Sequence, residues 1–171
     1  MSSVQLHLAL THVPVVLSFI AFIILLVSFI IKNETVAKVS YFLLVFAGIS
    51  AIPVFLTGEG AEEAVENLPG VSEAIIEKHE GLAKFALIAI SASGLVSLVV
   101  LFLSKQQALL RLGKIVILLL AIASSALMLQ TAHLGGQIRH TEIRSAAVGQ
   151  NAEGNTENGG AKESGNEDDD D

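Results

Sequence analysis

The sequence predicts an all-α integral membrane protein, an up-and-down four-helix bundle followed by a disordered acidic C-terminal tail. Apolar residues make up 52% of the 171 residues and charged residues 16%, whereas about 25% of a typical soluble domain is charged. The mean hydropathy is +0.65. Four apolar stretches each approach the length of about 20 residues that crosses a bilayer, and none has an acidic or basic residue in its middle. A soluble bundle would instead carry polar stripes at helical spacing.

The predicted transmembrane domain covers residues 5–144, with spans at about 8–31, 39–57, 82–103 and 115–132. The first span could be mistaken for a signal peptide. However, the segment "MSSVQLH" before it has no basic residue, its apolar run is too long, and no A-x-A-like cleavage site follows it. We therefore interpret it as a retained helix. The third span could begin as early as Ser72, which is a good N-cap residue.

Basic residues predict that both chain termini lie outside the cytoplasm. The long connection at 58–80 holds seven Glu and one Lys. Five basic residues lie instead in the two short loops: Lys32, Lys38, Lys105, Arg111 and Lys114. Because basic residues are enriched in cytoplasmic loops, the short loops are expected inside and the acidic connection outside.

All five histidines fall on the predicted outer side of this topology. His12, His79 and His133 should lie within a turn or two of the same depth, because a helix rises 1.5 Å per residue. His7 and His140 should lie further out. The chain has no Cys, which excludes covalent c-type heme, thiolate metal sites and disulfides.

Small side chains line two of the predicted spans. They let membrane helices approach closely, and they would equally leave room for a flat macrocycle. In the third span they share the face below His79, and a second set lies in the fourth span: Ala83, Ala86, Ser93 and Ser97, with Ile90 among them, and Ala121, Ser124, Ser125 and Ala132.

Several short motifs share their order and spacing with a known family. The stretch "HLALTHVP" keeps both histidines and the second proline of His-Pro-x-x-x-His-x-Pro, with Leu8 in place of the first proline. The remaining matches are "IPVFLTGEGA", "KHEGLAKFAL" and a Gly-Gly pair followed by a basic residue and His. They carry over these residues: Pro53, Thr57, Gly58, His79, Gly135, Gly136, Arg139 and His140.

Over about residues 5–142 the chain thus resembles the bacterial membrane family called domain of unknown function 2231. The usual aromatic residue after the glycines is absent, and His133 is not part of the motif. The resemblance implies a small four-helix protein of the bacterial inner membrane, in which a heme or redox role has been suspected.

The histidines favour a heme b site, because bis-His ligation needs two helices that present imidazoles to one iron. Helices one and three lie on a diagonal of an up-down bundle, so His12 and His79 are the first predicted axial pair. His7 and His140 would form a second pair, or would meet propionates and solvent, and His133 is a further candidate. Glu59 and Glu80 could orient ring N–H groups. The alternatives are a Zn or Cu site without heme and a purely structural subunit.

Charge limits the other functions and suggests partners. The span interiors have no ionisable residue, which argues against a pump or channel. The segment 145–171 holds eight acidic residues and one Lys, a composition typical of a disordered tail that would repel nucleic acid. We therefore expect an electron-transfer subunit of a larger complex, with membrane or periplasmic redox subunits, and a c-type cytochrome among the candidate partners.

Overall fold

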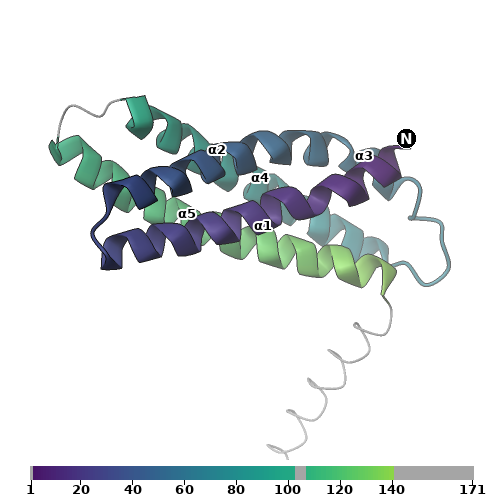
Figure 1. Cartoon of the computed structure of the whole chain (residues 1–171). Coiled ribbons are helices and arrows are strands. Elements are labelled where there is room, and N and C mark those ends of the chain that lie inside the picture. Colours follow the sequence, from purple (N-terminus) through teal and green to yellow (C-terminus); the bar gives the residue numbers. More distant parts are fainter. Residues whose placement is uncertain (1, 103–106, 141–171) are drawn as a thin grey trace, which may run out of the picture. The chain divides into compact units, whose positions relative to one another are not determined.

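The computed structural model describes residues 2–102 and 107–140, and within these ranges it contains five α-helices and no strand (Figure 1). Four helices are long and apolar enough to cross a membrane, which confirms the predicted all-α class and the number of spans. A short fifth helix, α3, lies in the acidic connection. Their bounds are α1 Ser3–Ile30, α2 Glu34–Leu56, α3 Gly58–Glu62, α4 Glu73–Phe102 and α5 Gln107–Arg139.

The chain divides into two compact units, residues 1–139 and 140–171. All five helices belong to the first unit. His140 is described in the second unit, whereas the predicted acidic tail at 145–171 lies outside the described residues.

Three of the long helices extend beyond the predicted spans at the end of the bundle that carries α3, called here the α3 end. Ser2 caps α1, because its side chain accepts the N–H of Gln5 while the Gln5 side chain accepts the N–H of Ser2. The backbone carbonyl of Ser72 accepts the N–H groups of Ile75 and Ile76 at the start of α4. The helix therefore starts where the N-cap suggested, and His79 lies inside α4.

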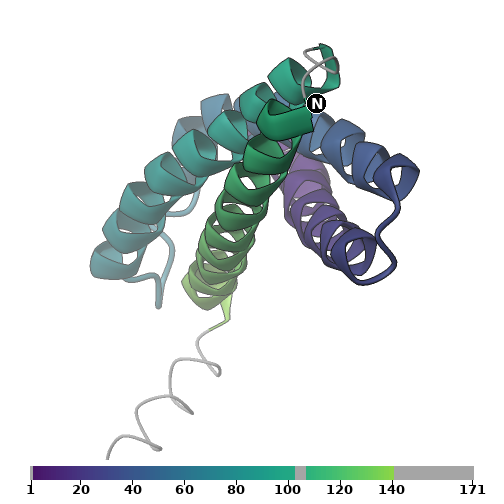
Figure 2. The same ribbon diagram turned by 90° about the vertical axis from the view of Figure 1, so that its left-hand side faces the viewer.

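The long helices form two hairpins that pack side by side. α1 packs against α2, and α4 packs against α5. Extensive contacts between α2 and α4 join the hairpins, and α1 also contacts α5. Figure 2 shows α5 between α4 and α1. The helices α1 and α4 therefore lie across a diagonal, as expected for an up-and-down bundle.

Glycine brings the backbones of α2 and α4 into close contact. A Cβ atom added at Gly94 would lie 3.0 Å from the carbonyl oxygen of Leu44 and 3.3 Å from the Cα of Val45. A Cβ atom added at Gly48 would lie 3.3 Å from the carbonyl oxygen of Ile90. Any larger side chain would force the two helices apart, so these glycines set the distance between the hairpins.

Buried serine hydroxyls connect the helices in the middle of the bundle. Ser40 on α2 donates to the carbonyl oxygen of Ala21 on α1 at 2.8 Å, and Ser125 on α5 donates to that of Ser18 on α1 at 3.1 Å. Most of the small residues singled out in the sequence are buried inside the bundle: Ala86, Ser93, Ser97, Ala121, Ser124 and Ser125. Their burial between the helices favours close helix packing over room for a macrocycle as the reason for the small side chains.

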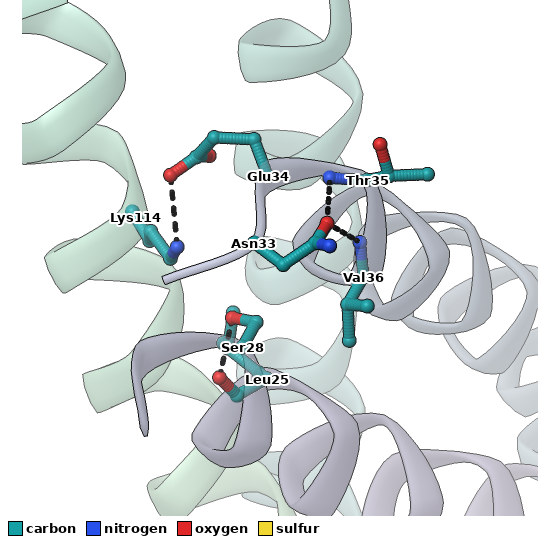
Figure 3. A network of polar contacts seen from close by, with 7 residues as sticks. All are labelled: Leu25, Ser28, Asn33, Glu34, Thr35, Val36 and Lys114. Carbon is teal, nitrogen blue, oxygen red and sulfur yellow. Dashed lines mark hydrogen bonds and ion pairs between the residues drawn. The ribbon is translucent and has the colours of Figure 1, made fainter. Parts of the chain in front are cut away.

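An ion pair holds three helices together at the opposite end of the bundle (Figure 3). Asn33 caps α2 by accepting the N–H groups of Thr35 and Val36, which places Glu34 beside α5. The Nζ of Lys114 lies 3.0 Å from Oε1 of Glu34. It also lies 4.8 Å from the ring centroid of Phe29 on α1. The Lys114 side chain is only 10% exposed, so its charge depends on these two partners.

The contact between α2 and α4 yields a test of the packing. We expect Gly94→Ala to lower the free energy of unfolding by about 1–3 kcal/mol, the usual cost of overpacking. The matched control is Gly81→Ala in the same helix, where an added Cβ meets no atom within 4 Å. Unfolding of both variants in detergent by titration with SDS checks this. Equal stability of the two variants would contradict the close approach.

Candidate histidine site at the α3 end

The structure places the four histidines of the helical unit toward the α3 end, in different surroundings. His7 lies in α1 and His79 in α4, and both are partly buried. His12 and His133 are exposed on α1 and α5, and His140 follows α5 as an exposed residue. The predicted clustering therefore resolves into two enclosed imidazoles and three exposed ones.

His7 is held by the end of α2. Its Nδ1 lies 2.9 Å from the carbonyl oxygen of Val54 and 3.3 Å from Oγ1 of Thr57. Val54 belongs to the last turn of α2, where backbone carbonyls lack a partner within the helix. The His7 side chain thus forms a hydrogen bond with a backbone carbonyl at the C-terminal end of α2. Gly58 follows immediately, and a Cβ atom there would lie 3.7 Å from Cε1 of the His7 ring.

His79 is held by a carbonyl in α5. Its Nδ1 lies 3.0 Å from the carbonyl oxygen of Thr131. In an α-helix, the side chain of the residue four positions later normally shields a backbone carbonyl from neighbouring helices. For the Thr131 carbonyl this residue is Gly135, which has no side chain. A Cβ atom at Gly135 would lie 3.1 Å from Cε1 and 3.5 Å from Nδ1 of His79. Because glycine lacks this atom, the imidazole can reach the carbonyl.

Both contacts define the same tautomer. A carbonyl oxygen only accepts, so Nδ1 of His7 and of His79 must carry the proton and donate it. In a neutral imidazole this leaves Nε2 as a lone-pair donor, the state in which histidine binds a metal. The two rings come from the diagonal helices α1 and α4. In each ring the nitrogen that does not contact the carbonyl is therefore Nε2.

The other histidines are less well placed for this role. The Gln137 amide donates to Nε2 of His133 at 2.9 Å, one helical turn away, so this nitrogen is occupied. His12 follows His7 by five residues, or about 140° of helix rotation, and is exposed. The geometry therefore favours His7, rather than His12, as the partner of His79. The sequence favours His12 because helices one and three lie on a diagonal and His12 and His79 have similar predicted depths.

Carboxylates surround the site without entering it. Oε1 of Glu80 pairs with Nζ of Lys84 at 2.8 Å, and Glu59 is exposed. The backbone carbonyls of Val54 and Thr131, rather than Glu59 or Glu80, accept the ring N–H groups. Partial burial and the nearby negative charges, first that of Glu80, raise the pKa of Glu62. These charges give the α3 end a negative potential.

Within the described ranges, no three His, Cys, Asp or Glu side chains gather into a group that could hold a metal ion. A zinc site needs three or four protein ligands. An iron in a porphyrin needs only two, since the macrocycle supplies the other four. The two partly buried histidines, His7 and His79, are fewer than the protein ligands that a zinc site needs.

These features define a four-helix membrane protein with a pair of enclosed imidazoles at one end. The family model described as "Predicted membrane protein (DUF2231)" matches residues 3–142, so the chain belongs to this family. The match spans the whole helical unit and the site. No curated protein matches, and no solved structure matches.

Gly135 provides a test of how His79 is positioned. We expect Gly135→Ala to displace the imidazole and weaken its bond to the Thr131 carbonyl, which should cost about 1–2 kcal/mol of unfolding free energy. The neighbouring Gly136→Ala is the matched control, because a Cβ atom there meets nothing within 4 Å. Thermal unfolding in detergent, with the His79 ring followed by NMR, checks both effects. An unchanged His79 resonance in Gly135→Ala would disprove the contact.

Proposed function

We propose that the protein is a heme b electron-transfer subunit, with His7 and His79 as the axial ligands. One observation carries the proposal. Each imidazole donates its Nδ1–H to a backbone carbonyl, at 2.9 Å for His7 and 3.0 Å for His79, which leaves Nε2 of both rings for iron. Such hydrogen bonds orient a ligating ring and raise its basicity.

The electron-transfer role follows from the position and composition of the site. Heme would supply reversible one-electron chemistry, and the protein residues would hold the ligands and limit access of water. The site lies at one end of the bundle, whereas the opposite end has an ion pair and no histidine among its described residues. Electrons would therefore enter and leave at the same membrane face. Zn or Cu remains the alternative cofactor, and it would need ligands from a further chain.

We further propose that this face is the periplasmic side of the bacterial inner membrane, with the N-terminus outside. The basic residues of the short loops support this orientation. The protein would then work with membrane or periplasmic redox subunits. A c-type cytochrome with a basic surface fits the acidic residues at the α3 end, because complementary charge speeds encounter.

Heme ligation can be tested by matched histidine variants. We expect His7→Ala and His79→Ala to lose most of the bound heme, because each removes an axial ligand. His12→Ala and His133→Ala should retain it, because both side chains are exposed. Reduced-minus-oxidised spectra and pyridine hemochrome assays of the purified proteins measure heme per chain. Full heme in His7→Ala, together with its loss in His12→Ala, would restore His12 as the ligand.

The orientation can be tested by cysteine labelling, since the natural chain has no Cys. Glu63→Cys lies beside α3, and Thr35→Cys lies in the first turn of α2 at the opposite end; both positions are exposed. In spheroplasts, a membrane-impermeant maleimide should label the first variant only. Labelling of the second variant alone would place the histidine site on the cytoplasmic side.

A further inference from the structure

Thr57 occupies the point at which α2 ends and His7 is bound. Its Oγ1 lies 2.8 Å from the carbonyl oxygen of Pro53, 3.0 Å from that of Val54 and 3.3 Å from Nδ1 of His7. Pro53 offers the nearest acceptor, four residues back, where Thr hydroxyls in helices commonly donate. With the proton used there, the lone pairs of Oγ1 remain available to His7.

The Nδ1–H of His7 therefore faces two acceptors, the Val54 carbonyl oxygen and Oγ1 of Thr57. In the other tautomer, the bare Nδ1 lone pair would lie 2.9 Å from the Val54 oxygen, which is a repulsive contact. A hydroxyl that already donates to a carbonyl is also a stronger acceptor, because hydrogen bonds in a chain polarise one another.

We propose that Thr57 is a positioning residue, which holds His7 in the Nδ1-protonated tautomer and so keeps Nε2 available to a metal. The inference deepens the proposed function and rests on it for its relevance to heme. The tautomer itself is a property of this chain alone, and it can be measured without any cofactor.

His79 provides the comparison within the same molecule. It too is bound beside a threonine, but the hydroxyl of Thr131 donates to the carbonyl oxygen of Leu127 at 2.8 Å, and His79 uses the Thr131 backbone carbonyl. Removing the Thr131 hydroxyl should therefore leave the acceptor of His79 in place. Thr131→Val is thus a matched control for Thr57→Val.

The experiment uses the full-length, heme-free protein in detergent, labelled with ¹⁵N-histidine. NMR gives the ratio of Nδ1–H to Nε2–H tautomers at His7. We expect this ratio to fall roughly twofold to tenfold in Thr57→Val, the range for loss of one ordinary hydrogen bond. It should recover in Thr57→Ser, which restores the hydroxyl, and stay unchanged in Thr131→Val. Thr57→Ala replaces Thr57→Val if the latter fails to fold.

An unchanged His7 ratio in the hydroxyl-free variant would overturn the proposal, and so would an equal fall in Thr131→Val. Heme content is measured separately on the same proteins. Absence of heme from the wild-type protein would overturn the proposed function while the tautomer result stands. Loss of heme only in the hydroxyl-free Thr57 variant would support both.

Discussion

The close approach of the α2 and α4 backbones at Gly48 and Gly94 is the constraint on which the rest of the structure depends. It is the main joint between the two hairpins, and an added Cβ atom at Gly94 would lie only 3.0 Å from the Leu44 carbonyl oxygen. Without a hydrophobic driving force between helices in lipid, such packing and hydrogen bonding must hold the bundle together. The joint sets how far apart the hairpins lie, and therefore how the hairpin that carries His7 is placed relative to the one that carries His79.

The fold could be predicted from the sequence because hydropathy and length are strong signals for membrane helices. The number of membrane-spanning helices, their diagonal arrangement and the start of α4 directly after Ser72 all followed from composition and local rules, whereas the short helix α3 was not predicted. The arrangement of the histidine site was harder to predict from the sequence. His79 was identified as a ligand candidate, but His12 was ranked above His7, because depth along a helix is easier to read from sequence than the direction of a side chain.

The contacts that hold the two imidazoles could not be read from the sequence. They are made by the backbone carbonyls of Val54 and Thr131, and every residue has a carbonyl. Glycine and threonine gave the only local signal. Gly135 leaves the Thr131 carbonyl accessible to His79, and the Thr57 hydroxyl lies beside the Val54 carbonyl. Both residues belong to the motifs shared with the family. The sequence suggested Glu59 and Glu80 as groups that orient ring N–H groups, whereas backbone carbonyl oxygens accept the Nδ1–H of His7 and His79.

His7 and His79 each have a hydrogen-bond acceptor within their own hairpin. The acceptor of His7 lies on α2, and that of His79 lies on α5. During synthesis α1 and α2 enter the membrane before α4 and α5. The first ring can therefore be oriented while the second half of the protein is still being made. A ligand that needs both rings has to wait until the second hairpin packs against the first. Assembly of the site would thus take two steps, and binding of the proposed cofactor would report that the bundle is complete.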